Sequence, residues 1–217
     1  MNTLEFIKKR YKISDDQKSP IKLRYSRFTE LPRLFKNLGF KVGAEIGVSR
    51  GLYSKNLFLK IPKLKMYCID PWEAYNEYVE YHDEHGQTVT KENYTIAMER
   101  LNGRNAVIIQ KFSMDAVKDF EDNSLDFVFI DGNHSFEYVI NDIAEWSKKV
   151  RPGGIIAGHD YWTSSTSNNW TEFVTDKDMI KLCQVKDAVD GWTKANNIQP
   201  WFVFTYDKCP TFFWVKE

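Results

Sequence analysis

Hydrophobic positions along this 217-residue chain follow two alternating patterns. In residues 26–39, leucine and phenylalanine recur at the spacing of one helix face, and the pattern stops at Gly39. Residues 41–48 then form a short, largely apolar run, which predicts a strand. The same alternation predicts further helices at residues 52–61, 93–103, 115–122 and 136–151, and further strands at residues 64–72, 106–113, 124–132 and 154–161.

The C-terminal part of the chain breaks this alternation. A helical pattern at residues 185–196 is followed by two strand-like runs, 200–206 and 211–217, which are joined by the short turn DKCP. A turn this short makes the two strands antiparallel neighbours. The sequence therefore predicts an α/β fold: a Rossmann-like, mostly parallel, seven-stranded sheet with helices on both faces and a C-terminal antiparallel hairpin.

The organisation of the chain indicates one domain over residues 1–217, because we find no internal repeat and no linker-like stretch. Residues 1–25 are interpreted as an N-terminal extension. Residues 73–90 fit neither a helix nor a strand pattern and directly follow a strand end. We therefore predict that they form a lid over a ligand site.

Composition disfavours several classes of protein. Thirty Lys and Arg balance thirty Asp and Glu, so the chain lacks the basic excess of a nucleic-acid binder. The three cysteines lack the spacing of a metal knuckle, and no stretch approaches the roughly 20 apolar residues that span a bilayer. The N-terminus also lacks the apolar core of a signal peptide. We expect a cytoplasmic protein with a small-molecule substrate and no membrane or nucleic-acid partner, and a homo-oligomer is compatible with the sequence.

The turn after the first long predicted strand carries the pattern E-x-G-x-x-x-G, formed by Glu45, Gly47 and Gly51. Glycine allows the backbone to approach a ligand closely, and ligands of open α/β sheets bind outside the carboxyl ends of the strands. Asp70 ends the next strand about twenty residues after the turn, where an acid can accept hydrogen bonds from both ribose hydroxyls of a nucleoside. These residues predict a nucleoside-containing ligand.

A second group of polar residues lies at the ends of two later strands. Asp131 ends one strand and His134 follows three residues later, while His159 and Asp160 end the next strand. Carboxylate oxygens bind hard divalent cations such as Mg²⁺. An imidazole with an unperturbed pKa near 6.5 can accept a proton close to neutral pH. The pattern therefore predicts a cation beside the nucleoside site.

The combined motifs resemble those of the class I S-adenosylmethionine-dependent methyltransferases. They are most similar to the metal-dependent O-methyltransferases of the macrolide-sugar and catechol types. The resemblance covers about residues 40–162 and rests on E-x-G-x-x-x-G, I-D-G-x-H, P-G-G and H-D-Y. Ser49 stands where the fuller pattern has a middle glycine, and His159 stands where the sugar-modifying enzymes have an acid.

The resemblance implies roles for individual residues. It implies a divalent cation, Mg²⁺ or another, held by Asp131, His159 and Asp160, with His134 as the general base. Ser113 and Met114, after the third long strand, would border the adenine. The full set implied to bind S-adenosylmethionine is Glu45, Gly47, Ser49, Gly51, Asp70, Ser113, Met114 and Asp131.

The leading hypothesis is an S-adenosylmethionine-dependent enzyme that methylates a hydroxyl group of a sugar, polyol or phenol. A regulatory subunit that binds S-adenosylmethionine without catalysis is an alternative, but a pure binder has no need of a base beside a metal. An NAD-dependent oxidoreductase is disfavoured by the glycine pattern and by the terminal hairpin. Asp142 and Glu145 fall on the predicted exposed face of helix 136–151, outside the expected site.

Overall fold

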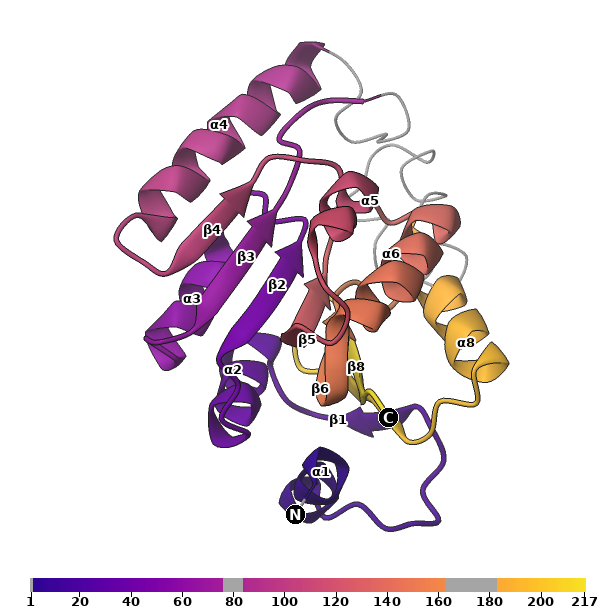
Figure 1. Ribbon diagram of the computed structural model, residues 1–217. Helices are drawn as coiled ribbons and strands as arrows, with labels where there is room; N and C mark the ends of the chain where they lie inside the picture. The colour runs from indigo at the N-terminus through magenta and orange to yellow at the C-terminus, as the bar shows by residue number, and fades with distance from the viewer. Residues whose placement is uncertain (1, 76–83, 163–182) are drawn as a thin grey trace.

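The computed structural model describes residues 2–75, 84–162 and 183–217 (Figure 1). The strands are β1 (Ile21–Leu23), β2 (Val42–Ile46), β3 (Lys65–Ile69), β4 (Ala106–Ile109), β5 (Leu125–Ile130), β6 (Val150–Gly158), β7 (Trp201–Phe204) and β8 (Thr211–Val215). The helices are α1 (Thr3–Tyr11), α2 (Arg27–Asn37), α3 (Leu52–Lys60), α4 (Glu84–Leu101), α5 (Ser113–Ala116), α6 (Phe136–Lys149) and α8 (Val185–Ala195), with a 3₁₀ turn η2 (Val117–Asp119) after α5.

All eight strands form one sheet in the order β1-β7-β8-β6-β5-β2-β3-β4. Among the strands of the described residues, only β8 runs antiparallel to its neighbours, β6 and β7. The direction of strand succession reverses at β2, which pairs with β3 on one side and with β5 on the other. Ligands of open α/β sheets bind at such a reversal, so the topology places a site at the carboxyl ends of β2 and β5.

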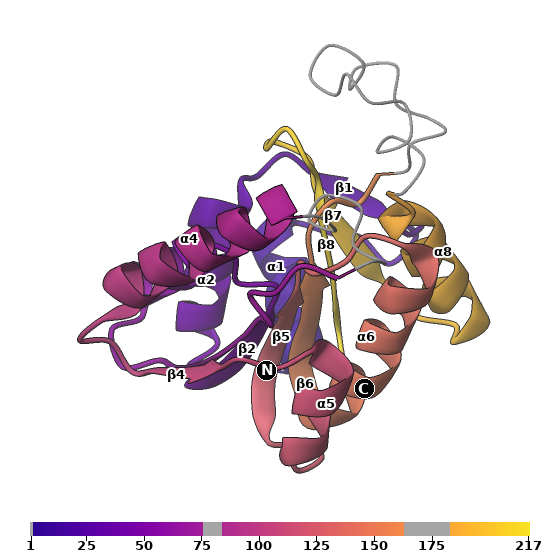
Figure 2. The same ribbon diagram turned by 90° about the horizontal axis from the view of Figure 1, so that it is seen from above.

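Helices cover both faces of the sheet (Figures 1 and 2). The side chains of β5 alternate between two hydrophobic clusters: Phe127 and Phe129 pack with residues of α1 to α4, while Val128 and Ile130 pack with residues of α5, α6 and α8. A strand with both faces buried reads as a continuous apolar run, which is how β5 appears in the sequence. The prediction of an α/β fold with a C-terminal antiparallel hairpin is confirmed.

The sheet has one strand more than the seven predicted. The additional strand, β1, lies within residues 1–25 and pairs in parallel with β7 through Ile21, Lys22 and Leu23. β1 has three residues, and of these only Ile21 is buried. A strand this short, with one buried side chain, produces no recognisable hydrophobic pattern. Residues 1–25 also contain α1, whose Asn2 forms a capping box with Glu5. This segment is therefore built into the fold and is more than an extension.

The predicted lid is partly helical. Residues 84–90 begin α4, so the prediction of an irregular segment is wrong for them, and residues 76–83 lie outside the described part of the chain. The buried polar side chains of Thr90 and Asn93 border the same cavity as Asp70. This part of α4 presents polar side chains to the cavity. It therefore lacks the apolar stripe by which a helix is recognised in a sequence.

Within the described residues, no helix combines the length and apolar character needed to cross a bilayer.

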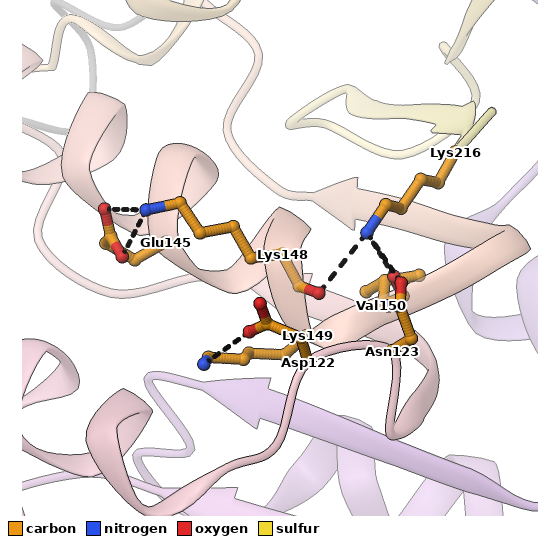
Figure 3. A network of polar contacts seen from close by, with 7 residues as sticks. All are labelled: Asp122, Asn123, Glu145, Lys148, Lys149, Val150 and Lys216. Atoms are coloured by element: carbon orange, nitrogen blue, oxygen red, sulfur yellow. Dashed lines mark hydrogen bonds and ion pairs between the residues drawn. The ribbon is translucent and has the colours of Figure 1, made fainter.

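The Lys216 side chain joins three elements (Figure 3), which meet near the amino ends of β5 and β6. Its ammonium group donates hydrogen bonds to the carbonyl oxygens of Val150, at 2.6 Å, and Lys148, at 3.3 Å, and to Oδ1 of Asn123 at 3.1 Å. These carbonyls lie at the C-terminus of α6, where helix hydrogen bonding ends and a cation is favourable. Lys216 thus satisfies acceptors that the helix leaves open.

Replacing Lys216 with Met should lower the free energy of unfolding by about 1 to 3 kcal/mol, the usual scale for hydrogen bonds to a charged group. Urea unfolding followed by tryptophan fluorescence measures the loss. The matched control is Lys148→Met, which removes only the exposed pair with Glu145 and should change the free energy by less than about 0.5 kcal/mol. Equal losses in the two variants would contradict the role given to Lys216.

Candidate functional site

The turn after β2 packs directly against the end of β5. Gly47 has a φ of 84°, and a Cβ built on it would lie 2.0 Å from the carbonyl oxygen of Asp131. The Gly47 amide donates to Ile69 at 2.9 Å, and the Asp131 amide donates to Ile46 at 2.8 Å. The turn is therefore held between the ends of β3 and β5 at a separation that excludes any side chain at Gly47.

Asp70 fixes the conformation of this turn. Its Oδ2 accepts a hydrogen bond from the Ser49 amide at 2.8 Å, and its Oδ1 accepts one from the Trp72 amide at 2.7 Å. Burial raises the pKa of the Asp70 carboxyl, while these backbone hydrogen bonds lower it. Each carboxylate oxygen has two acceptor positions, so both oxygens retain capacity for a ligand hydroxyl.

Glu45 is a buried acid at the inner end of the same turn. Its side chain is 2 % exposed, and its Oε2 accepts a short hydrogen bond from the Ser54 hydroxyl. Burial raises the pKa of Glu45 to about 8, although the Ser54 hydrogen bond and the positive charge of Arg27 both lower it. Glu45 and Arg27 therefore lie at the same end of the site.

A cavity of about 950 Å³ connects these residues, which is large enough for a nucleoside-containing ligand and part of a second molecule. Its wall continues from Asp70 past Ser113 and Met114 to the α6 side of the sheet. Gly51, His159 and Asp160 do not border it. The predicted site residues that line it are Glu45, Gly47, Ser49, Asp70, Ser113, Met114, Asp131 and His134.

The four acid and imidazole residues come together because β5 and β6 are parallel neighbours. Ile130 pairs with Gly158, so the residues that follow, Asp131 and His159, leave the sheet side by side. The Nε2 of His134 lies 3.2 Å from Oδ2 of Asp160. The Nδ1 of His159 lies 3.1 Å from the same oxygen and 3.3 Å from Oδ1 of Asp131. We call Asp131, His134, His159 and Asp160 the acid–imidazole cluster.

The acid–imidazole cluster contains a donor set of suitable size for a cation. One ligand atom from each of Asp131, His134 and Asp160 lies within 4.8 Å of the others. Two ligands at about 2.1 Å from one ion are at most about 4.2 Å apart, so small side-chain adjustments would place all three in one coordination sphere. The two carboxylates alone suit Mg²⁺, whereas an added imidazole suits Zn²⁺ or Fe²⁺ better.

Two further groups, His159 of the cluster and the neighbouring Cys209, also offer ligand atoms. The Nδ1 of His159 faces both carboxylates, and when it carries a proton it donates to them, which leaves only Nε2 of that ring able to bind a metal. Cys209 lies with His159 and Asp160 in a second donor set. Burial raises the pKa of the Cys209 thiol, as do the charge and hydrogen bond of Asp160, and metal binding requires a thiolate. The first donor set therefore fits a cation better.

A family model described as "Methyltransferase domain" matches residues 44–161, more than half of the chain. The chain belongs to this methyltransferase family. The match spans the turn with Glu45, the Asp70 strand end and the whole acid–imidazole cluster, which ends at Asp160. The methyltransferase assignment leaves the alternative of an NAD-dependent oxidoreductase without support.

Solved structures show the same fold for the methyltransferase at low sequence identity. A putative caffeoyl-CoA O-methyltransferase from Staphylococcus aureus superimposes with a TM-score of 0.60 at 12% identity, covering 100% of this chain and 93% of that one. A SAM-dependent methyltransferase from Aquifex aeolicus superimposes with a TM-score of 0.54 at 18% identity, covering 85% and 88% of the two chains.

A curated relative is the uncharacterized protein R132 of Acanthamoeba polyphaga mimivirus, which is 37% identical over 99 residues. The match covers 42% of the methyltransferase chain and 45% of the relative, so less than half of that relative's length is represented.

Asp142 is a cavity residue of the methyltransferase that sequence analysis placed on an exposed helix face, and that prediction is wrong. It is 4 % exposed, and its Oδ1 accepts a short hydrogen bond from the Ser113 hydroxyl. That hydroxyl in turn accepts from Nε1 of Trp146 at 2.8 Å. The helix pattern could not reveal this position, because an acid that faces a polar cavity is indistinguishable in sequence from one that faces solvent. Glu145, predicted with it, does pair with Lys148 at the surface.

Arg27 and Tyr53 also line the cavity, beside Glu45, and are not among the predicted site residues. Tyr53 packs on Phe129 with ring centroids 4.0 Å apart, and the Arg27 guanidinium lies 4.6 Å from the centre of the Phe28 ring. A tyrosine on a helix and an arginine near a helix start are common in any sequence. No local signal distinguishes these two from ordinary packing residues.

Replacing Asp142 with Asn should make stability less dependent on pH. Burial raises the pKa of Asp142 to about 7, whereas the unfolded chain releases that proton near 3.9. Between about pH 4 and pH 7 the native state therefore holds more protons, so the free energy of unfolding falls as pH rises. Asn cannot titrate and keeps an acceptor for Ser113, so the variant should gain stability relative to wild type through this window.

Urea unfolding at several pH values measures this difference. Glu145→Gln is the matched control, because it removes an exposed acid from the same helix and should reproduce the wild-type profile. Parallel profiles for Asp142→Asn and wild type would contradict the buried, protonated state of Asp142.

Proposed function

We propose that this methyltransferase transfers the methyl group of S-adenosylmethionine to a hydroxyl oxygen of a small molecule, with the help of a divalent cation. The observation that carries the proposal is the position of Asp131, which lines the cavity shared with Asp70 and also belongs to the acid–imidazole cluster. A bound nucleoside and a base would therefore lie next to each other. The structures of similar fold include a putative caffeoyl-CoA O-methyltransferase and a SAM-dependent methyltransferase, which supports the same chemistry.

The cavity supplies groups for each part of S-adenosylmethionine. Asp70 would accept hydrogen bonds from the ribose hydroxyls, with its orientation set by the Ser49 and Trp72 amides. Ser113 and Met114 would border the adenine, beside the buried Asp142. The Gly47 turn, free of a side chain, would admit the methionine portion close to the backbone.

The acid–imidazole cluster would handle the acceptor. Asp131 and Asp160 would hold the cation, with His159 donating to both carboxylates. When bound, the cation would lower the pKa of a hydroxyl coordinated to it. A proton on the His134 nitrogen that faces Asp160 leaves the other ring nitrogen as an acceptor, and the Asp160 carboxylate stabilises the imidazolium that forms.

Methyl transfer to the acceptor hydroxyl requires that one proton be removed from it. The acceptor oxygen forms a bond to the methyl carbon, the bond from that carbon to the sulfonium sulfur breaks, and the hydroxyl proton passes to His134. The products are a methyl ether and S-adenosylhomocysteine. Because the methyl group is already activated, catalysis consists mainly of alignment and proton removal.

Asp70→Ala should weaken the binding of S-adenosylhomocysteine by about 1 to 3 kcal/mol, since it removes charge-assisted hydrogen bonds to the ribose. Isothermal titration calorimetry measures the change. The control is Asp122→Ala, which removes an exposed acid near the amino end of β5 and should leave binding unaltered. Unchanged affinity in Asp70→Ala would exclude Asp70 from the nucleoside site.

His134→Ala should slow methyl transfer by roughly a hundredfold or more, the usual cost of losing a general base, while S-adenosylhomocysteine affinity stays near the wild-type value. Single-turnover rates measure this with an acceptor found in a panel of sugars, polyols and phenols. Asp131→Asn should weaken binding of added Mg²⁺, Mn²⁺ or Zn²⁺, and EDTA should abolish turnover.

Three outcomes would change the proposal. Full turnover in EDTA would remove the cation and leave the two aspartates as orienting groups. A full rate in His134→Ala would place the base elsewhere, with His159 the next residue to replace. Binding of S-adenosylhomocysteine without methylation of any acceptor would favour the regulatory subunit.

A further inference from the structure

Three buried polar atoms at one end of the cavity lack hydrogen-bond partners among the described residues. They are Nε and Nη1 of Arg27 and the hydroxyl oxygen of Tyr53. Both residues line the cavity, and Tyr53 is only 4 % exposed. Leaving such groups unpaired costs free energy, most of all for a charged guanidinium, so the site is incomplete as it stands.

The contacts of Arg27 and Tyr53 hold the two side chains in place but do not provide acceptors for their hydrogen-bond donors. The Arg27 guanidinium lies 4.6 Å from the centre of the Phe28 ring and 5.9 Å from that of Tyr53, and aromatic faces attract a cation without accepting its hydrogen bonds in line. The Arg27 backbone amide donates to Asp207 at 2.7 Å, which anchors the start of α2 to the loop before β8. The Tyr53 ring packs on the Phe129 ring, with the ring centroids 4.0 Å apart.

The local charges favour an anion at this position. Glu45, a cavity acid on which the Arg27 charge acts, already accepts from Ser54, and its pKa of about 8 leaves it largely protonated at neutral pH. The Arg27 charge is then not neutralised by Glu45. The Arg27 guanidinium offers charged N–H donors to a carboxylate oxygen, and the Tyr53 hydroxyl offers a further donor.

We propose that Arg27 and Tyr53 form a carboxylate subsite that binds the carboxylate at the amino-acid end of S-adenosylmethionine. This assignment rests on the proposed function, because it takes that molecule as the occupant of the cavity. Tyr53 belongs to α3, which follows directly from the Gly47 turn, and Glu45 and Asp70 influence each other electrostatically. A ligand whose ribose reaches Asp70 can therefore extend past Glu45 to these donors.

The subsite has a role beyond affinity. The amino-acid end and the adenosine are the two arms attached to the sulfonium sulfur, so gripping both fixes the position of the methyl group between them. Asp131, which borders the cavity near Tyr53, carries the acceptor side of the site. Arg27 and Tyr53 are thus positioning residues for the donor.

The test compares two ligands that differ only in the carboxylate: S-adenosylhomocysteine and its decarboxylated analogue, which keeps the amine and the adenosine. Calorimetry on the wild-type protein should show roughly tenfold to hundredfold tighter binding of S-adenosylhomocysteine, the scale of charge-assisted hydrogen bonds. Arg27→Met should remove most of this preference by weakening S-adenosylhomocysteine alone. Tyr53→Phe should reduce it by a smaller factor, and Arg24→Met, which removes an exposed arginine outside the cavity, should leave it intact.

Each contrary result has a distinct meaning. Equal binding of both ligands by the wild-type protein, or an unchanged preference in Arg27→Met, overturns the carboxylate subsite while the proposed function stands. An acceptor carboxylate held by Arg27 would give the same unchanged preference, because only the donor is varied. Binding of neither ligand by the wild-type protein overturns the proposed function and the subsite together. If Arg27→Met fails to fold, Tyr53→Phe decides: a wild-type preference in that variant overturns the subsite.

Discussion

The close contact between Gly47 and the Asp131 carbonyl is the constraint on which the site depends. A Cβ at Gly47 would approach that oxygen to 2.0 Å, so the turn after β2 can lie against the end of β5 only without a side chain. Strand order reverses at this point, which places the Asp70 turn on one side and the acid–imidazole cluster on the other. A bulkier residue would separate the two halves that the proposed transfer needs side by side.

Burial of acids around the cavity makes its electrostatics unusual. Burial raises the pKa of Glu45 to about 8 and that of Asp142 to about 7, so these two acids carry less negative charge near neutral pH than exposed acids would, and burial also raises the pKa of Asp70. Each of these acids receives at least one hydrogen bond from a hydroxyl or backbone amide. Arg27, in contrast, has buried donors without acceptors among the described residues. The proposed ligand would bring hydroxyls to Asp70 and an anion to Arg27.

A separate group of polar contacts lies near the amino ends of β5 and β6. There Lys216 satisfies carbonyls at the end of α6 and joins them to the last strand (Figure 3). The antiparallel β8 lies between β6 and β7. Cys209, in the loop before β8, lies with His159 and Asp160. The loop of the terminal hairpin thus contacts the acid–imidazole cluster.

The sequence by itself determined the α/β class, the terminal hairpin and the strand ends that carry Glu45, Asp70, Asp131 and Asp160. These features follow from local patterns, because a buried strand is apolar and the polar residue that ends it is visible in the chain. The tertiary structure alone decided which polar side chains face the cavity. Asp142 and Arg27 carry no local signal, since exposure to a cavity and exposure to solvent select the same residue types. The short β1 and the polar first turns of α4 have no hydrophobic period in the sequence for a related reason. β1 is held by pairing with β7, and the first turns of α4 pack along a polar cavity.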